Sequence, residues 1–300
     1  MPNNRLTASG KKKKSVFRRV VNGFLRALRV LPENRPGDRL LSYARFVASH
    51  GRLPSDARLF NDVLYKLKTS DEILDPLRVF VSDKEFVKLY IKAVVGDEYN
   101  IPTLAVLNSM QAVDDYDFPA NCCIKATHAS GRVILRKQGA PVDKELIKSW
   151  FHLNYYRMRR EANYKTLKPK IIVEPLLFDS DNVEDYRFFC FKGQVKMIMI
   201  DMNIRDKPAR RRLLFDANWS VLPFSMGYPK AAQSIPRPAN FDAMLDVVHR
   251  LSRPFGFIRV DLYSNGERLF VGELTNTHAD ASQNFIPPSA EAMASELIFH

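Results

Sequence analysis

Short runs in the middle and at the end of the chain are either apolar throughout or alternate apolar and polar residues. Such runs, bounded by turn-forming residues, are typical of β-strands. The stretch 121–137 predicts two strands joined by a turn of small residues, and Lys192 with Gly193 predicts another turn. The other predicted strands are 101–109, 170–178, 185–193, 195–202, 212–219, 257–263 and 269–275.

Apolar residues recur at helical spacing in other segments, most of them early in the chain. In the segment that begins at Ser82, Ser82 and Glu85 have the spacing of a capping box, and Gly96 marks the predicted end of the helix. Its predicted apolar face comprises Phe86, Leu89, Tyr90 and Val94. The other helical patterns cover 38–50, 56–69, 142–166 and 241–255. This arrangement predicts an α+β fold with largely antiparallel sheets.

The last two predicted strands carry charged residues among Phe, Ile, Val and Leu. Side chains alternate along a strand, so Arg259 and Asp261 share one face of the first strand. A buried carboxylate without a partner is costly, so Asp261 and Glu273 require a cation or a proton. On the second strand, the residues on the face of Glu273 are predicted to be Leu269, Val271 and Thr275.

The two acids can share a cation only if they face the same way. Opposed residues of antiparallel strands have Cβ atoms about 4.5 to 5.5 Å apart. Asp261 and Glu273 are directly opposed only if the turn is centred on Glu267, whereas a two-residue turn at Asn265 and Gly266 places them on opposite faces. We therefore expect a longer loop or a β-bulge.

A pair of facing carboxylates suits Mg²⁺, which prefers carboxylate oxygens and water and often completes its shell with nucleotide phosphates. Arg259, on the face of the acids, could balance their charge or hold a developing anion. The alternative is a structural ion pair between Arg259 and Asp261, with Glu273 in solvent.

Two earlier segments contain residues suited to a nucleotide. Lys125 follows an apolar run, and the turn at Ser130 and Gly131 could bring backbone N–H groups to phosphate oxygens. The alternative is an ordinary hairpin with a solvated lysine. Glu174 follows another apolar run, where it could meet a nucleotide base or lie on an edge strand.

The net charge of +13 belongs mainly to the N-terminal arm, because the first 32 residues contain nine Lys or Arg and no acid. The rest has 37 basic and 33 acidic residues, a net of +4, so no specific nucleic-acid partner is expected. Residues 16–31 have helical apolar spacing among arginines, and Pro32 ends the pattern. This helix could lie on an anionic membrane, dock on its own domain or act as a mitochondrial transit sequence.

Other sequence features exclude several classes of protein. No run of 18 apolar residues is present, so no membrane-spanning helix is predicted. Cys122, Cys123 and Cys190 form neither a disulfide framework nor a C-x-x-C motif, and reduced thiols in a cytosolic protein are expected. The common phosphate-binding loop, zinc-protease and serine-hydrolase motifs are missing from the sequence.

Five short motifs occur in a characteristic order: SDK, IKATHASG, IIVEPLL, DYRFFCFKG, and RVDLY with FVGELTNT. In this order they resemble the ATP-grasp superfamily, and more closely its TupA-like branch, which is associated with teichuronopeptide synthesis. The resemblance extends from about Ser82 to Phe285. It implies an ATP-grasp fold, in which two α+β subdomains clasp ATP between antiparallel sheets after a helical N-terminal region.

The resemblance also implies roles for the matching residues on the nucleotide. Lys84 and Lys125 would bind the phosphates of ATP, and the turn at Ser130 and Gly131 would close over them. Glu174 would meet the adenine. The residue on the ribose side would be Asp185, and His128 would either touch a phosphate or order the loop.

By the same resemblance, Asp261 and Glu273 would hold Mg²⁺ and Arg259 would stabilise charge during phosphoryl transfer. Many ATP-grasp enzymes have a metal-binding Asn two residues after the Glu. Here that position is Thr275, and Asn276 is out of register by one residue. The number of metal ions therefore stays open.

The implied activity is that of an ATP- and Mg²⁺-dependent ligase that joins a carboxylate to an amine through an acylphosphate. Its product would be an amino acid or amine attached to an acidic cell-surface polysaccharide or peptide precursor. The basic run at 204–215 could bind the acidic substrate or be a solvated loop. Its arginines are Arg205, Arg210, Arg211 and Arg212. The rival functions are a kinase or glycosyltransferase of polysaccharide synthesis and a non-catalytic basic adaptor.

The expected domain organisation follows the change from helices to strands. We expect a basic arm with an amphipathic helix over 1–37 and a helical or α/β region over 38–115. An ATP-grasp small subdomain is expected over 116–184, and a C-terminal subdomain with the metal site over 185–300. The expected location is cytoplasmic, with peripheral attachment to the inner face of the membrane through residues 16–31.

Overall fold

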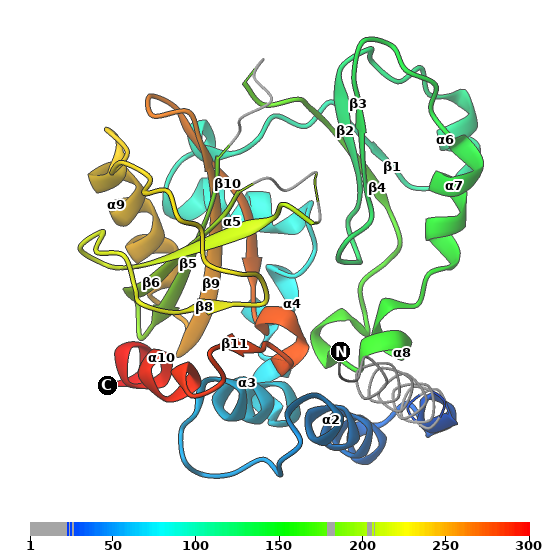
Figure 1. The fold of residues 1–300 in the computed structure, drawn as a ribbon. Helices are drawn as coiled ribbons and strands as arrows, with labels where there is room; N and C mark the ends of the chain where they lie inside the picture. Colours follow the sequence, from blue (N-terminus) through cyan, green and yellow to red (C-terminus); the bar gives the residue numbers. More distant parts are fainter. Residues whose placement is uncertain (1–22, 24, 26, 179–183, 203–205, 207) are drawn as a thin grey trace, which may run out of the picture.

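The computed structural model describes residues 23, 25, 27–178, 184–202, 206 and 208–300. Two sheets stand side by side, with helices on their outer faces and across one end (Figure 1). The larger sheet has the strand order β10-β9-β5-β6-β7, and the smaller has the order β1-β4-β2-β3. All the strand pairs described in these two sheets are antiparallel, which confirms the expected α+β class.

The predicted strands are present, and several are shorter than their sequence patterns. The apolar run 101–109 contributes only three strand residues. Lys192 and Gly193 form the predicted turn, each with a positive φ. The strands are β1 (Ala105–Leu107), β2 (Cys122–Ala126), β3 (Val133–Arg136), β4 (Ile171–Pro175), β5 (Glu184–Phe191), β6 (Gln194–Met202), β7 (Arg211–Asp216), β8 (Ser225–Met226), β9 (Phe257–Ser264), β10 (Leu269–Thr275) and β11 (Phe285–Ile286).

Four of the predicted helical segments each contain one main helix with shifted ends, whereas 142–166 is broken into four short helices between Lys144 and Tyr164. The helix predicted from residue 38 begins at Arg35, because the Asn34 side chain accepts a hydrogen bond from the Gly37 backbone N–H, and it ends before Gly51 in a left-handed conformation. The α-helices are α2 (Arg35–His50), α3 (Phe60–Thr69), α4 (Pro76–Phe80), α5 (Phe86–Val94), α6 (Met110–Asp115), α7 (Lys144–Ser149), α8 (Tyr155–Arg159), α9 (Phe241–Ser252) and α10 (Ala290–Phe299). The 3₁₀ helices are η1 (Leu28–Val30), η2 (Asp71–Leu74), η3 (Asp97–Tyr99), η4 (Trp150–His152), η5 (Ala162–Tyr164) and η6 (His278–Ala281).

One face of the larger sheet is apolar along its whole length. The alternation of side chains sends Phe188 of β5, Ile198 of β6 and Val260 of β9 to this face, where all three are fully buried. Helices α5 and α9 cover it with Ile91 and Val248. Each such side chain contributes roughly 1.5 to 3 kcal/mol of transfer free energy, so this layer anchors the sheet.

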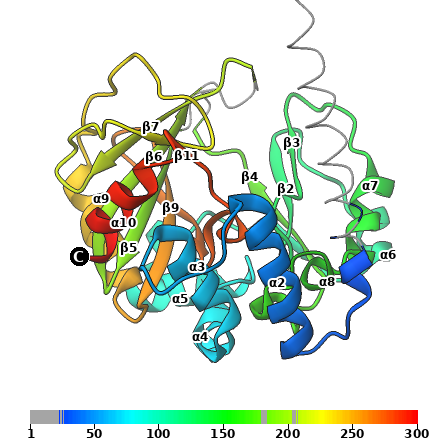
Figure 2. The same cartoon turned by 60° about the horizontal axis from the view of Figure 1, so that its bottom comes forward.

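The opposite face of the larger sheet changes character along its strands. At one end, Phe189, Met197 and Leu214 pack with α3 and α10 in a second apolar core. At the other end, the same alternation brings Arg187 and Asp261 to this face in place of apolar residues. Helices α2 and α3 lie below the two sheets in Figure 1 and come forward in Figure 2, and α3 packs against α10 and η6.

The smaller sheet also has one apolar face and one mixed face. Ile124, Ile171 and Val173 are fully buried in a third core beneath α6, α7 and η4. The alternate positions of β2 and β4 place Lys125 and Glu174 on the other face. Strand β1, which precedes residue 116, belongs to this sheet, so the sheet takes one of its four strands from the 38–115 segment.

The expected capping box at the start of α5 is wrong. The Asp83 side chain accepts the hydrogen bonds of the Glu85 and Phe86 backbone N–H groups, and the Ser82 hydroxyl instead donates to the Arg78 carbonyl. The expected apolar face is rotated as well. Phe86 and Leu89 are exposed, and Val87 and Ile91 are buried, because α5 docks on β10 and α9.

The predicted amphipathic helix at 16–31 lies largely outside the described residues. Its described end is fixed to the fold, because the buried Arg160 guanidinium donates to the carbonyls of Leu31 and Pro32. Among the residues that the structure describes, none of the helices is long and apolar enough to cross a membrane.

Candidate active site

Asp261 on β9 and Glu273 on β10 lie directly opposite each other in the hairpin register. Loop 265–268 joins the strands, and a register shift at Gly272 adds one residue to β10. The predicted longer loop and the β-bulge are therefore both present, and the acids face the same way. The expectation that Leu269 and Val271 share their face is wrong, because the bulge sends these two residues into the core.

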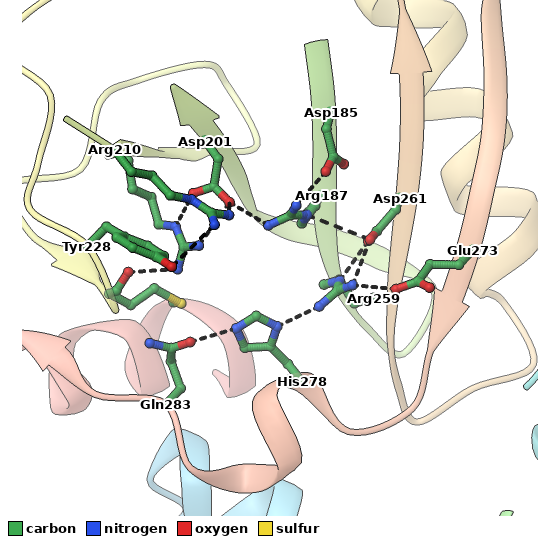
Figure 3. A network of polar contacts seen from close by, with 12 residues as sticks. Asp185, Arg187, Asp201, Arg210, Tyr228, Arg259, Asp261, Glu273, His278 and Gln283 are labelled. Atoms are coloured by element: carbon green, nitrogen blue, oxygen red, sulfur yellow. Dashed lines mark hydrogen bonds and ion pairs between the residues drawn. The ribbon is translucent and has the colours of Figure 1, made fainter. Parts of the chain in front are cut away.

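Arg259 lies between the two acids, as Figure 3 shows. Its Nε and Nη2 donate to the two oxygens of Asp261, each over 2.6 Å, and Nη2 also donates to Glu273 Oε1 over 2.8 Å. The Thr275 hydroxyl donates to the same Oε1 over 2.8 Å. The structural Arg259–Asp261 pair is thus present, and Glu273 is part of it rather than turned to solvent.

The two carboxyls differ in their affinity for a proton. Burial raises the pKa of Asp261, and the nearby charge of Glu273 adds to the rise although Arg259 opposes it. Burial alone would also raise the pKa of Glu273, but Arg259 and Lys84 outweigh burial and lower that pKa to about 2. Two carboxyls that share one guanidinium are expected to separate in this way.

The donor set fits a hard divalent cation such as Mg²⁺. Two carboxylates and the Thr275 hydroxyl present oxygens on one face, and oxygen ligands are what Mg²⁺ takes. Among the described residues, no cluster of three or more His, Cys, Asp and Glu could hold a metal by itself. A cation at Asp261 and Glu273 would therefore need water or phosphate oxygens to complete its shell.

Asn276, the residue out of register in the sequence, points away from the acids. Its side chain is buried, accepts from Arg78 Nη1 over 2.9 Å and donates to the Arg78 carbonyl over 3.1 Å. The side chain on the acidic face is that of Thr275, so a second metal ligand of the Asn type is missing from this hairpin.

A second charged group surrounds Asp201 at the end of β6. Its carboxylate is fully buried and accepts from Arg187 Nη1 over 2.7 Å, from Arg210 Nη2 over 2.5 Å and from Arg212 Nε over 2.6 Å. Burial opposes ionisation of Asp201, but these arginines outweigh it and lower its pKa below the usual range. Three cations around one anion give this group a local excess of positive charge.

Arg187 joins the two charged groups, as Figure 3 shows. Besides Asp201, it pairs with Asp185 and lies 3.8 Å from Asp261 Oδ2. The network therefore has two ends. At the acidic end, Asp261 and Glu273 bind Arg259. At the basic end, three arginines bind the single carboxylate of Asp201. We name the whole set the polar network. It comprises Asp185, Arg187, Asp201, Arg210, Arg212, Tyr228, Arg259, Asp261, Glu273, His278 and Gln283.

The four arginines expected to bind an acidic substrate occupy different environments. Arg210 is part-buried, donates from Nη1 to the Tyr228 hydroxyl over 3.2 Å and lies over the Tyr228 ring. Arg212 is buried, and its three guanidinium nitrogens bond Asp201 and the Met226 carbonyl. Arg211 donates to the carbonyls of Pro208 and Arg210, and Arg205 lies outside the described residues.

On the smaller sheet, Glu174 binds two lysines at once. Lys125 Nζ lies 2.6 Å from Oε2 and Lys88 Nζ lies 2.6 Å from Oε1. Burial disfavours the ionised carboxyl of Glu174, but the two lysines outweigh it and lower its pKa. Strand β3 adds Val133 and Leu135, which are exposed although apolar and face the same way as Lys125 by register.

Lys84 lies just before α5 and contacts the turn between β2 and β3. Its ammonium donates to the Ala129 carbonyl over 2.8 Å, next to the turn at Ser130 and Gly131. Burial lowers the pKa of Lys84, and the charge of Glu273 is the largest effect that opposes this fall. Lys84 therefore contacts the turn between β2 and β3 through the Ala129 carbonyl, and its charge interacts with that of Glu273 on β10.

The turn itself has the geometry that its sequence suggested. Gly131 adopts a positive φ of 72°, and no atom lies within 4 Å of a Cβ placed there, so Gly131 and the exposed Ser130 border open space. His128 is buried beneath the turn and its Nε2 contacts the Trp150 carbonyl at 3.1 Å. This contact favours a loop-ordering role for His128.

Asp185 lies opposite Tyr263 on the mixed face of the larger sheet. Its Oδ2 pairs with Arg187, and its Oδ1 is buried without a hydrogen-bond partner in the part of the chain that the structure describes. An unpaired buried acceptor of this kind can accept a donor from a ligand.

Sequence reasoning missed Arg187, Asp201, Tyr228 and His278. Arg187 and Asp185 have the same signal as Arg259 and Asp261, namely an Arg and an Asp two apart within an apolar strand. That signal could have identified Arg187. The sequence signal for Asp201 was weaker, because a single acid at a strand end is usually solvated.

Comparison with known proteins supports one family. The chain matches the TupA-like ATPgrasp family over residues 63–298, which is most of its length. No curated protein matches it significantly.

Three solved structures match the chain at low similarity. The D-alanine–D-alanine ligase from Helicobacter pylori has 18% identity and a TM-score of 0.38, over 68% of this chain and 56% of that chain. The D-alanine–D-alanine ligase from Bacillus anthracis, complexed with ATP, has 16% identity and a TM-score of 0.39, over 73% of this chain and 62% of that chain. The D-cycloserine synthetase DcsG has 15% identity and a TM-score of 0.38, over 74% and 72%.

This chain thus spans less than two thirds of the length of the two D-alanine–D-alanine ligases. The assignment rests on the family match, which covers far more than half of the sequence. The chain belongs to the TupA-like ATP-grasp family.

Proposed function

We propose that this protein is an ATP- and Mg²⁺-dependent ligase that joins a carboxylate to an amine through an acylphosphate. The observation that carries the proposal is the opposed pair of Asp261 and Glu273, which a bulge turns to one face and whose Glu273 carboxyl has its pKa lowered by Arg259 and by Lys84, just before α5. Family membership supports the use of ATP. The nucleotide in this proposal lies between the two sheets.

At the acidic end, Asp261, Glu273 and Thr275 would hold the cation. Mg²⁺, when bound there, would neutralise phosphate charge and orient the nucleotide. Arg259 bridges Asp261 and Glu273 in the described structure, so its Nη2 would have to release at least one carboxylate oxygen when a metal enters. The freed edge of Arg259 would then be available to the anion that develops during phosphoryl transfer.

The smaller sheet would supply the rest of the nucleotide site. Lys84 and Lys125 would bind phosphate oxygens, and the Ser130–Gly131 turn, which borders open space, would close over them. We assign Glu174 to the adenine side and Asp185, with its unpaired oxygen, to the ribose side. The exposed apolar edge of β3 could cover the base.

The basic end of the polar network would bind the carboxylate substrate. Among the three arginines of the basic run that the structure describes, Arg210 is the one whose guanidinium is both part-exposed and in contact with Asp201. Arg212 is enclosed by its own partners, so we propose a structural role for it. Arg187 lies between the two ends of the network and would guide the substrate toward Arg259.

The reaction would proceed in two steps in which charge neutralisation and positioning supply most of the acceleration. A carboxylate oxygen attacks the γ-phosphorus, the bond from that phosphorus to the β–γ bridging oxygen breaks, and ADP leaves. An amine nitrogen then attacks the acyl carbon. The new C–N bond forms as inorganic phosphate departs, and the amine loses a proton.

The substrate class we propose is an acidic cell-surface polysaccharide or peptide precursor, with an amino acid or amine as the second reactant. The division into an arm (1–37), a helical region (38–115) and two ATP-grasp subdomains (116–184 and 185–300) belongs to this proposal. So does a cytoplasmic location with residues 16–31 on an anionic membrane. Binding of the full chain to vesicles with and without phosphatidylserine would test the last point.

The test of the ligase proposal is product analysis with purified protein, ATP and Mg²⁺. Amino acids and uronic acids are screened in pairs for ADP release, and the products are identified by mass spectrometry. An amide together with ADP and phosphate is expected, and Asp261→Asn should abolish it. The control is Asp246→Asn, which changes an exposed acid whose ion pair in the described part of the chain is with Arg250 at 3.7 Å. A phosphorylated or glycosylated acceptor would overturn the proposal.

A further inference from the structure

The loop after β10 holds His278 against the arginine of the acid pair. Arg259 Nη1 lies 2.6 Å from His278 Nδ1, and His278 Nε2 lies 3.0 Å from Gln283 Oε1 (Figure 3). His278 is buried, and its ring stands edge to face with Phe189 at 5.0 Å. The imidazole therefore has one fixed orientation.

The partners of His278 determine its tautomer. Arg259 can only donate, so Nδ1 must carry a lone pair and accept. Gln283 Nε2 donates to the Asn284 carbonyl, which leaves Gln283 Oε1 to accept from His278 Nε2–H. Burial and the charge of Arg259 lower the pKa of His278 well below its usual value, in agreement with a neutral ring.

The backbone around His278 is held in place at a cost. Ala279, Asp280 and Ala281 all have positive φ, a conformation that is unfavourable for non-glycine residues. Asp280 bonds Lys68 and Arg45, and these bonds fix the turn. Such strain persists where the surrounding contacts over-determine a conformation, often at functional sites.

Gln283 is anchored as firmly as the turn. Its backbone N–H donates to Asn61 Oδ1 over 3.0 Å, and Asn61 Nδ2 donates to its carbonyl over 2.9 Å. The chain of contacts therefore runs from α3 through Gln283 and His278 to Arg259. It reaches Arg259 on the Nη1 edge, whereas both carboxylates occupy the Nε and Nη2 edge.

We propose that His278 is a positioning residue for Arg259, through a contact that Arg259 keeps when a cation displaces it from Asp261 or Glu273. The inference rests on the proposed function, because that function brings the cation to the acids. His278 is an uncharged acceptor on the Nη1 edge of Arg259. Its hydrogen bond is therefore unaffected when a cation replaces Arg259 at the carboxylates on the opposite edge. It holds the guanidinium beside the acids against the repulsion of the cation.

The distinction between the two ring nitrogens gives a matched pair of variants. In His278→Asn, the side-chain oxygen occupies roughly the place of Nδ1 and can accept from Arg259. In His278→Gln, the side-chain amide reaches the place of Nε2 and leaves the Nη1 edge of Arg259 without its acceptor. A purely structural role in packing would affect both variants alike, and thermal melting establishes that each is folded.

Enzyme kinetics distinguish positioning of Arg259 from a purely structural role of His278 in packing. The wild type and His278→Asn should have kcat values within about threefold of each other, and His278→Gln should lose about tenfold to a hundredfold in kcat, the scale of a misplaced catalytic group. The Kd of a non-hydrolysable ATP analogue with Mg²⁺ should stay within about threefold in all three. Equal kcat values for the Asn and Gln variants would overturn the proposal.

A second readout does not depend on the ligase activity. Nitrogen-15 resonances of the histidine ring should show an unprotonated Nδ1 and a protonated Nε2 in the wild type, before and after Mg²⁺ with the ATP analogue is added. A protonated Nδ1 in either state would overturn the positioning role. If the tautomer is as expected and no ADP is released with any acceptor, the ligase proposal fails while the contact from His278 to Arg259 stands.

Discussion

Replacing Asp201 by Asn tests whether the basic end of the polar network is held together by one buried anion. The Asp201 carboxylate is fully buried and accepts four hydrogen bonds of 2.5 to 3.0 Å from Arg187, Arg210 and Arg212. Asn keeps the shape of the side chain but removes its charge. Arg212, which is only 4% exposed, would then be a buried cation without an anion.

The expected decrease in the free energy of unfolding follows from the cost of leaving a buried charge unpaired, which is about 3 to 5 kcal/mol. A shift of about 2 to 4 °C per kcal/mol applies to domains of this order of size, so the melting temperature should fall by about 6 to 20 °C. The free energy of unfolding is measured by urea denaturation followed by circular dichroism. A change in midpoint with an unchanged slope is expected, since no other part of the fold changes.

Arg210→Met is the matched control. Arg210 is 17% exposed at its side chain and is one of three cations on a single anion, so its removal lowers the local excess of positive charge. The free energy of unfolding should change by less than about 1 kcal/mol, the scale of a part-exposed ion pair. An Asp201→Asn protein as stable as the wild type, or an equal loss for Arg210→Met, would refute this reading of the network.

Two further predictions concern the bulge and a buried acid. In Gly272→Ala the new methyl group would lie 2.6 Å from the Tyr263 ring, so the variant should lose about 1 to 3 kcal/mol, and an unchanged melting temperature would contradict the close approach. Glu161 is buried beside Thr277, and burial, assisted by the charge of Asp280, raises its pKa to about 7. Its contribution to stability is therefore present below its unfolded pKa of 4.5 and is lost as the pH rises to about 7. Glu161→Gln should flatten that part of the pH–stability curve and be more stable than the wild type at pH 8, by on the order of 2 kcal/mol, and parallel curves would contradict the assignment. The charged and titratable groups near Glu161 are Lys68, Arg159, Asp280, Tyr155 and Tyr164.

Period-two patterning predicted the larger sheet well, because its strands are long enough for alternation to be distinctive. The same patterning failed on β10, where the extra residue at Gly272 changes the parity of every position after it. The need for two acids to face one cation predicted that a bulge or a longer loop exists. It did not predict where the extra residue lies.

The start of α5 shows a different limit. Ser82 and Asp83 are both good capping residues, and the S-x-x-E spacing favoured Ser82. In the structure the Ser82 hydroxyl is taken up by long-range contacts, since Asn163 and Asn276 both donate to it. Asp83 therefore caps the helix, and no local pattern could have shown this.

Part of the candidate site could be predicted from the sequence, and the rest again depended on long-range contacts. Residues in one hairpin, such as Arg259, Asp261 and Glu273, are linked by register and can be placed by counting. The link from Arg187 to Asp201 crosses between strands whose pairing depends on the whole sheet. His278 was equally hidden, because its role depends on three successive left-handed residues with no glycine among them.

The central claim is that the opposed acids hold a cation that a nucleotide shares. Its most direct test is calorimetric titration of the full chain with a non-hydrolysable ATP analogue, with and without Mg²⁺. The wild type and Asp246→Asn should bind the analogue far more tightly with Mg²⁺, and Asp261→Asn should lose that difference. Binding that is the same with and without Mg²⁺ in the wild type, or a full Mg²⁺ effect in Asp261→Asn, would contradict the claim.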